Sequence, residues 1–524
     1  MSTKYSVFFR VDSSSVIGSG HVIRCLSLAD YCLSHGFDVY FIISDLPGNL
    51  YSLISQNYIT FKLPTSNDFL SFFTFDYSSY VQLPPQLQCL DARQTYESIQ
   101  HLLFSTNAYL ILDHYSLAKP WESAFLSFGS SCPLKIIVID DLSNRDHFCH
   151  ILLDSNSILP FKTSSIYTSL VPKDCKLLIG SRYSLLSSSY KELSASKKVP
   201  SLKRRVLVYF GGTDPFDITY KTLIILVLSK FSAFTFDVVI GIQSHSYSKI
   251  CSLVSDCPNI SIHSFVPSLS SLIYSSDFAI GSVGTTSWER ICLQLPTLAI
   301  SLSDNQFALA DQLSSFQLID YIGYAPNISD TQLSSRIDDF LFKSEPNPIP
   351  YGVVDGFGCT RLISSFCGPS SPITLRSANL LDEFLLFSWA NEPTTRNNSL
   401  STKPITLKEH STWFENVLHD PFRLLLICED SSSCPIGQIR FDVSSCGTSA
   451  YFSFSLDPSV RGFKLSRRIL DLSLNYIRKT FKSLLFVRAQ VKITNIASSQ
   501  CFSRFGFSRE SISSDNIENW IFYF

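Results

Sequence analysis

The sequence predicts an α/β protein in which two successive domains with parallel sheets are followed by a third domain of α+β type. Apolar strands alternate with helices from Tyr5 onward, and a polar, basic stretch at Ser187–Arg205 interrupts this alternation before it starts afresh. The order of elements changes after a short tether at Cys367–Pro372. A chain of 524 residues is long enough for three or four domains of about 150 residues each.

The first domain is expected to span residues 1–195. An apolar run at Tyr5–Val11 is followed by a Ser/Gly loop at Asp12–Gly20, a segment with helical spacing at His21–His35 and a strand at Asp38–Ile43. Further buried strands are expected at Tyr109–Leu112 and Lys135–Ile139, each ending in Asp. Such alternation is typical of a parallel sheet that helices cover on both faces.

The second domain is expected to span residues 204–366 and to repeat this plan. Its strands are predicted at Arg205–Phe210, Phe236–Gly241, Ile260–Ser264, Phe278–Ile280 and Thr297–Ile300. Two adjacent α/β domains imply a cleft between them, and ligands of such sheets bind outside the carboxyl ends of the strands.

The third domain, residues 373–524, is expected to have an α+β plan. A hairpin-like pair is predicted at Leu424–Glu429 and Gly437–Asp442, followed by strands at Ala450–Leu456 and Leu484–Val491 and a helix that runs to Gly506.

Composition excludes several classes of function. The formal net charge of -2 gives no basic field for nucleic acid or an anionic membrane. No apolar segment reaches the roughly 20 residues of a membrane span, and the N-terminus does not read as a signal peptide. The 15 cysteines form no Cys-x-x-Cys pair and no zinc-type spacing, so we expect reduced thiols, no metal and a cytoplasmic protein.

The first candidate site is a glycine loop that ends in histidine, Gly18-Ser19-Gly20-His21. Glycines let backbone amides approach a ligand, and the N-terminus of a helix favours anions such as a diphosphate. An imidazole in the first turn is suited to act as a general base near neutral pH. A helix-capping loop with an incidental histidine is the alternative.

The second candidate site consists of two loops in the second domain that would hold a nucleotide. Small and hydroxyl residues at Gly284, Thr285, Thr286 and Ser287 offer donors to a diphosphate, and Glu289 is placed to accept the hydroxyls of a ribose. The other loop contains Gly211 and Gly212, in the run Gly-Gly-Thr-Asp-Pro after the first strand of this domain. Asn305 and Gln306, after a later strand, add polar groups at the same edge of the sheet. Ordinary turn chemistry is the alternative.

These motifs resemble a known family. The run from Phe9 to Arg24 is similar to the opening of the UDP-2,4-diacetamido-2,4,6-trideoxy-β-L-altropyranose hydrolases of the pseudaminic acid pathway. Further matches in the right order are Asp113-His114-Tyr115, Asp140-Asp141-Leu142 with Arg145 and His147, Leu152-Leu153-Asp154, Gly211-Gly212-Thr213-Asp214-Pro215, Thr286-Ser287-Trp288-Glu289-Arg290 and Asp304-Asn305-Gln306. The resemblance covers about Tyr5 to Phe366.

The resemblance implies a glycosyltransferase-B-like pair of Rossmann-type domains with UDP held by the second. His21 would activate water for attack at the anomeric carbon, with inversion, and Tyr115 would lie at the sugar. Asn305 would lie near the nucleotide-sugar, and Asp12, Gly18, Gly20 and Arg24 would belong to the substrate site. No metal is implied.

The third domain resembles the GNAT acetyltransferases, and within them the enzyme that acetylates the UDP-4-amino sugar of the same pathway. The matching segments include Trp389-Ala390-Asn391-Glu392-Pro393, Asp457-Pro458-Ser459-Val460-Arg461-Gly462 and Asn495-Ile496-Ala497-Ser498. The resemblance implies that acetyl-CoA binds at Arg461, Gly462, Lys464, Ser466 and Asn495. Two departures are Lys464, where the family has glycine, and Phe502, where many members have a tyrosine general acid.

The leading hypothesis is therefore a bifunctional enzyme that acetylates a UDP-4-amino sugar and then hydrolyses the product to UDP and free sugar. One alternative is a glycosyltransferase that uses a sugar acceptor in place of water. The other is a protein that binds a nucleotide-sugar and carries a degenerate acetyltransferase domain.

Overall fold

The computed structural model describes residues 5–14, 17–65, 82–103, 107–158, 160–196, 203–212, 214–242, 244–264, 266–342 and 348–524. Ser15, Val16 and Thr213, which belong to the two glycine loops, lie outside these ranges. The chain divides into two compact units, Met1–Ile158 with Ile166–Cys359, and Leu159–Ser165 with Thr360–Phe524. The first unit contains two parallel sheets and the second contains a mostly antiparallel one.

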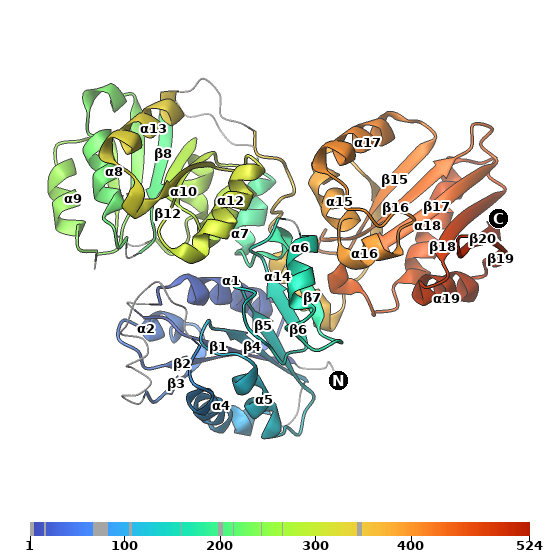
Figure 1. Cartoon of the computed structure of the whole chain (residues 1–524), viewed down its shortest axis with the longest axis horizontal. Coiled ribbons are helices and arrows are strands. Elements are labelled where there is room, and N and C mark those ends of the chain that lie inside the picture. Colours follow the sequence, from blue (N-terminus) through green and yellow to red (C-terminus); the bar gives the residue numbers. More distant parts are fainter. Residues whose placement is uncertain are drawn as a thin grey trace. The chain divides into compact units, whose positions relative to one another are not determined.

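The first sheet has seven parallel strands in the order β3-β2-β1-β4-β5-β6-β7. Its strands are β1 (Tyr5–Val11), β2 (Asp38–Ser44), β3 (Ile59–Leu63), β4 (Asn107–Asp113), β5 (Leu134–Ile139), β6 (Ile151–Asp154) and β7 (Lys176–Ile179). Helix α1 (Gly20–Ser34) covers one face, and α4 (Pro85–Ile99) and α5 (Lys119–Ser127) cover the other (Figure 1). The strand order reverses between β1 and β4, so the loops that follow these two strands diverge and leave room for a ligand.

The second sheet has the same order in its six parallel strands, β10-β9-β8-β11-β12-β13. The strands are β8 (Arg204–Tyr209), β9 (Phe234–Val239), β10 (Ile260–His263), β11 (Phe278–Ser282), β12 (Thr297–Ser301) and β13 (Asp320–Tyr324). The order reverses between β8 and β11, and these are the strands that precede the Gly211 and Gly284 loops. Both predicted loops therefore follow the two strands at the reversal point of this sheet.

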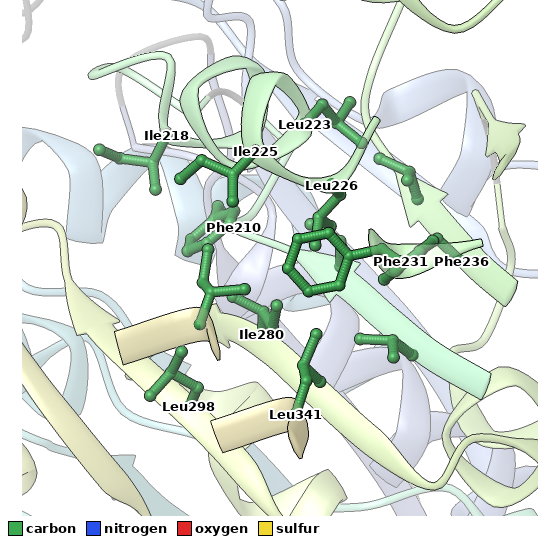
Figure 2. Close-up of a cluster of buried hydrophobic side chains, with 14 of the residues drawn as sticks. Phe210, Ile218, Leu223, Ile225, Leu226, Phe231, Phe236, Ile280, Leu298 and Leu341 are labelled. Carbon is green, nitrogen blue, oxygen red and sulfur yellow. The ribbon is translucent and has the colours of Figure 1, made fainter. Parts of the chain in front are cut away.

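A tightly packed apolar core supports the second sheet. Figure 2 shows the side chains of α8 (Ile218–Leu226) pointing toward Phe210 and Phe236, with Ile280 and Leu298 on the neighbouring strands. Phe231 and Ile280 are fully buried. Because such interiors are close-packed, the strand ends that carry the loops are held in fixed positions.

The second unit has a seven-stranded sheet in the order β14-β15-β16-β17-β18-β20-β19. The strands are β14 (Thr374–Ser377), β15 (Arg423–Glu429), β16 (Pro435–Val443), β17 (Ser449–Leu456), β18 (Phe486–Lys492), β19 (Ser508–Ile512) and β20 (Ile517–Tyr523). The helices include α15 (Glu383–Ala390), α16 (Pro393–Asn398), α17 (Leu407–His419), α18 (Ser466–Thr480) and α19 (Ile496–Phe505). The predicted hairpin is present as β15 and β16, which pair antiparallel.

Two features of this sheet were not predicted. The chain continues beyond the helix at Gly506 into β19 and β20, and β20 inserts between β18 and β19. Strands β17 and β18 pair in parallel only over Ser449–Tyr451 and Phe486–Arg488. The remainder of β17, from Phe452 to Leu456, therefore has no ladder partner on the β18 side, which leaves an open edge inside the sheet.

Three further properties bear on the kind of protein this is. Among the described helices, none combines the length and the apolar character that a membrane crossing requires. All 15 cysteines are free thiols. Within the described ranges, no group of three or more His, Cys, Asp or Glu side chains is arranged to hold a metal ion.

Candidate functional site

The loop after β1 places His21 in the first turn of α1. Gly18 adopts a φ of 81° and donates its backbone N–H to the Ser14 carbonyl at 2.9 Å, just before the helix begins at Gly20. A φ of this sign is in the left-handed region that favours glycine. The His21 side chain is 8% exposed.

Asp113 at the end of β4 holds the His21 ring. Strands β1 and β4 pair with Val11 opposite Asp113, so the carboxylate lies beside the loop that follows β1. The distance from His21 Nδ1 to Asp113 Oδ1 is 2.6 Å. Because an ionised carboxylate only accepts hydrogen bonds, Nδ1 must carry the proton. No described residue forms a hydrogen bond with Nε2, so the second ring nitrogen is left for a ligand.

Arg24, one turn further along α1, fixes this carboxylate from the other side. Its Nε donates to Asp113 Oδ2 at 2.6 Å and its Nη2 donates to Asp113 Oδ1 at 2.7 Å. Burial raises the pKa of Asp113, but Arg24 and His21 outweigh burial and hold that pKa well below its usual range. Asp113 is therefore ionised at neutral pH.

Tyr115 approaches the same histidine through a second carboxylate. The Tyr115 hydroxyl donates to Asp141 Oδ2 at 2.9 Å, and Arg24 Nη1 donates to the same oxygen at 2.7 Å. The rings of Tyr115 and His21 meet edge to face with centroids 4.4 Å apart. The other oxygen, Asp141 Oδ1, is buried and has no hydrogen-bond partner among the described residues.

The predicted residues His21, Arg24 and Tyr115 are thus brought together, and Asp113 and Asp141 complete the group. Neither aspartate was predicted as a site residue, although each stands at the end of a buried strand within a motif. Two carboxylates face one guanidinium, so the group carries one uncompensated negative charge while the imidazole is neutral. A proton taken up by His21 would neutralise it.

Asp12 does not join this group. Its side chain accepts from Arg10 Nη1 at 2.7 Å and from the Ser44 N–H at 2.7 Å, and His114 Nε2 lies 3.2 Å away. Asp12 is 1% exposed. The structure therefore places this predicted substrate residue in a buried network that ties β1 to its neighbours.

The loop after β11 leads into α11 (Thr285–Cys292). Gly284 adopts a φ of 151°, Thr285 is exposed, and Thr286 is half-buried. Ser287 is buried, where its Oγ accepts the Gly284 N–H at 3.3 Å and a bond from Arg290. The exposed first turn leaves amides of Thr285 and Thr286 without intrahelical acceptors, as at every helix start.

The two loops meet. A methyl group at Gly20 would lie 3.9 Å from Thr285 Oγ1, and a methyl group at Gly284 would lie 3.9 Å from Gln306 Nε2. The start of α1, the start of α11 and the loop after β12 therefore share one region of the first unit.

Glu289, one turn into α11, has a buried carboxyl oxygen and a raised pKa. Its Oε2 is buried and has no hydrogen-bond partner among the described residues. Burial raises the pKa of Glu289 to about 7, against the opposing effects of Tyr190 and Arg290. An unpaired buried carboxylate oxygen is costly, and a hydroxyl donor from a ligand would satisfy it.

The remaining predicted residues of this half line the same strand ends. Gly211 adopts a φ of 96°, and no atom of the described residues lies within 4 Å of a methyl group placed at Gly211 or Gly212. Asn305 is exposed, and its Oδ1 accepts from Ser303 Oγ at 2.5 Å. Gln306 uses its Oε1 to accept the Leu302 N–H at 2.7 Å.

In the second unit, the predicted acetyl-CoA loop runs from Arg461 to the start of α18 at Ser466. The Arg461 guanidinium pairs with Glu392 at 2.6 Å, so it is directed at the protein. Gly462 adopts a φ of 91°, and no atom in the described part of the chain lies within 4 Å of a methyl group placed there. Lys464 adopts a φ of 58°, a conformation that glycine takes most readily, and its exposed side chain makes no ion pair with a described residue.

Asn495 and Phe502 each have a structural role in this unit. Asn495 caps α19 by accepting the Ser498 N–H at 3.3 Å. Phe502 is 3% exposed and packs edge-on against Phe452 and Phe454, where β17 leaves β18. Phe502 therefore fills the core beneath the open edge of β17.

Comparison with known proteins supports a GNAT acetyltransferase domain at the C-terminus, because residues 373–508 match the acetyltransferase (GNAT) domain family. The crystal structure of spermidine N-acetyltransferase from Vibrio cholerae with CoA and spermine is 17% identical over 29% of this chain and 95% of its own, with a TM-score of 0.27. A domain from Methanocaldococcus jannaschii is 17% identical over 30% of this chain and all of its own, with a TM-score of 0.26.

Two curated relatives extend into the first unit. The uncharacterized protein MJ1062 of Methanocaldococcus jannaschii is 22% identical over 98% of both chains. The UDP-2,4-diacetamido-2,4,6-trideoxy-beta-L-altropyranose hydrolase of Campylobacter jejuni is 28% identical over 209 residues, which is 40% of this chain and 61% of that protein. The match thus spans less than two thirds of the hydrolase.

Proposed function

We propose that the first unit hydrolyses a UDP-linked diacetamido sugar, UDP-2,4-diacetamido-2,4,6-trideoxy-β-L-altropyranose, to UDP and free sugar. The observation that carries the proposal is His21, held through Nδ1 by Asp113 at 2.6 Å, with Nε2 unbonded among the described residues. The partial similarity to the Campylobacter hydrolase supports the substrate class. The six strands of the second sheet follow the same order as the first six of the first sheet, which supports a glycosyltransferase-B arrangement of the unit, with the nucleotide on the second sheet.

The proposed reaction is an inverting displacement. His21 Nε2 takes a proton from water as the water oxygen bonds to the anomeric carbon, and the bond between that carbon and the diphosphate oxygen breaks. The imidazolium offsets the excess charge of Asp113 and Asp141, which are already fixed by Arg24. The departing UDP carries its charge at the N-terminus of α11, where backbone amides and the helix dipole stabilise an anion.

The test is UDP release by the full chain from this nucleotide-sugar with no acceptor sugar present, in water enriched in ¹⁸O. We expect equal amounts of UDP and free sugar by mass spectrometry, with the label in the sugar and none in UDP. Release that needs an added acceptor would favour the glycosyltransferase alternative. Binding of the nucleotide-sugar without turnover would favour a binding protein.

The ribose of UDP is proposed to donate its hydroxyls to Glu289, which gives a pH prediction. With a pKa of about 7, this carboxyl is mostly neutral at pH 6 and mostly ionised at pH 8. Only the ionised form accepts two hydroxyl hydrogen bonds, so affinity for an intact UDP-sugar should rise by about tenfold between these pH values. Calorimetry on the wild type and on Glu289→Gln measures this. The Gln variant should bind weakly with a flat profile, and an equal slope in both proteins would contradict the assignment.

We further propose that the GNAT domain uses acetyl-CoA to acetylate the UDP-4-amino sugar that precedes the hydrolase substrate. The match of residues 373–508 supports acetyl transfer. The Gly462 loop at the start of α18 supports a phosphate site, because no described atom lies within 4 Å of a methyl group placed at Gly462. Mass spectrometry of the purified chain with the UDP-4-amino sugar should give the released diacetamido sugar only when acetyl-CoA is added.

Lys464 is expected to contribute charge to this site. Its ammonium is exposed and has no described ion-pair partner, so Lys464→Met should weaken acetyl-CoA binding by about tenfold at low salt and less at high salt. Lys479→Met, at the far end of α18, is the matched control and should bind normally. Tighter binding by Lys464→Met would mean that the side chain obstructs the loop.

A further inference from the structure

A short segment after β6 connects the two sheets of the first unit. Asn156 Oδ1 accepts the indole N–H of Trp288 at 3.1 Å, and the Ile158 backbone N–H donates to Gln312 Oε1 at 3.2 Å. Asn156 and Ile158 follow a strand of the first sheet, whereas Trp288 lies on α11 and Gln312 on α12 (Phe307–Ser315) of the second. Two hydrogen bonds therefore pass directly between the half that carries His21 and the half that carries the α11 loop.

The segment is anchored firmly on its own side. The Asn156 N–H donates to Asp154 Oδ1 at 2.7 Å. The Tyr167 hydroxyl lies 3.0 Å from Asp154 Oδ2 and 2.8 Å from Asp140 Oδ2. A phenol has one proton to donate, so the Tyr167 hydroxyl bridges the two carboxyls. Burial, with Asp141 and Asp140 nearby, raises the pKa of Asp154 well above its usual range.

The residues that anchor the Asn156 segment are connected to the residues around His21. Asp140 is charged, since Arg145 Nη2 lies 2.9 Å from its Oδ1 and burial is outweighed by His147 and Arg145, which lower its pKa. The next residue is Asp141, whose Oδ2 accepts from both Arg24 and Tyr115. The chain of contacts thus runs from the Asn156 segment to the side chains that surround His21.

On the side of the second sheet, Trp288 lies in the first turn of α11, so its position is tied to the N-terminus of that helix. It lies one turn after Thr285 and is 1% exposed. The indole N–H is the only polar group of this side chain, and it donates its hydrogen bond to Asn156. A rigid ring with a single donor fixes both distance and direction.

We infer that Asn156 and Trp288 are a pair of positioning residues that set the distance between the nucleotide end of α11 and the His21 base. This inference rests on the proposed hydrolase function. Nucleotide-sugar bound at α11 meets the base only when the two halves keep this spacing, and a misplacement of about 1 Å costs on the order of 100-fold in rate.

The test is a double-mutant cycle on the full chain. Trp288→Phe removes the N–H and keeps a ring, and Asn156→Leu removes the acceptor at similar volume. Each is expected to lower kcat for UDP release by about tenfold with KM nearly unchanged, and the double variant should be no slower than either. Multiplied effects, or an unchanged kcat in either single variant, would overturn the inference. Asn259→Leu is the control, because among the described residues its side chain donates to the carbonyls of Phe231 and Phe234 in its own domain, and its kcat should match the wild type.

Amide hydrogen exchange gives a readout that needs no turnover. UDP should slow exchange of the Ile158 amide in the wild type, and this protection should be absent in Trp288→Phe although UDP still binds. Protection that persists in Trp288→Phe would overturn the pairing even in an active enzyme. A wild type that binds UDP and transmits protection but releases none from the sugar would overturn the proposed hydrolysis alone.

Discussion

His21→Ala is expected to lower kcat for UDP release by about 10³-fold, within the range that a positioned general base contributes, while UDP affinity stays close to that of the wild type. The physical reason is that the imidazole acts on water, whereas the nucleotide is held by the loops of the second sheet. Steady-state release of UDP and calorimetry with UDP measure the two quantities separately. A variant that keeps more than a tenth of the wild-type kcat would remove His21 from the mechanism.

Asp113→Asn sharpens this test because it leaves the ring in place. The amide keeps the volume of the carboxylate, but it removes the charge that holds the Nδ1 proton at 2.6 Å. We expect kcat to fall by at least about 10²-fold with a changed pH profile, since the imidazolium loses its partner. Added imidazole should partly restore His21→Ala and should leave Asp113→Asn unchanged, which separates loss of the base from loss of its orientation.

Arg10→Met is expected to destabilise the first sheet by about 3–5 kcal/mol, the cost of leaving buried charges without their partner. The Arg10 guanidinium is completely buried between Asp12, at 2.7 Å, and Asp91, at 2.5 Å. Removing it leaves both carboxylates in a site that water does not reach. Hydrogen exchange of the β1 amides in the full chain measures the free energy of opening at this sheet.

The matched control for Arg10 is an ion pair on the surface of the same domain. Lys119 lies 3.4 Å from Asp146, and the two side chains are 53% and 57% exposed. Lys119→Met should therefore change the free energy of opening by less than about 1 kcal/mol, because water screens the pair. An equal change in the free energy of opening for the two variants would mean that burial of the Arg10 network does not add to its stabilising effect.

Much of the fold follows from local patterns. The apolar run at Tyr5–Val11 is β1 over the same residues, and the helix expected from His21 begins one residue earlier, at Gly20. The short strand β3 and the terminal strands β19 and β20 were not predicted. Strand β19 is exposed at all of its residues, so it has no apolar alternation to detect, and its place in the sheet is fixed only by pairing with β20.

For the candidate site, local sequence predicted His21, the glycine loops and the α11 hydroxyls, because a strand–glycine–helix junction has a recognisable composition. For Asp12 the motif position predicts a ligand contact, whereas in the structure its oxygens contact Arg10, Ser44 and His114. Local sequence gave no sign that Asn156 would meet Trp288, 132 positions away in the chain.

By itself, the sequence determined the alternation of strands and helices, the glycine turns at their junctions and the imidazole at the start of α1, since each depends on neighbours a few residues apart. Only the tertiary structure decided which carboxylates meet that imidazole. The register of β1 against β4 brings Asp113 to His21, and the order of strands in the sheet brings Asp141 and Tyr115 to Arg24. The physical reason is that parallel strands align their carboxyl ends at one edge, so residues far apart in the chain share a site whose partners are set by strand order and packing.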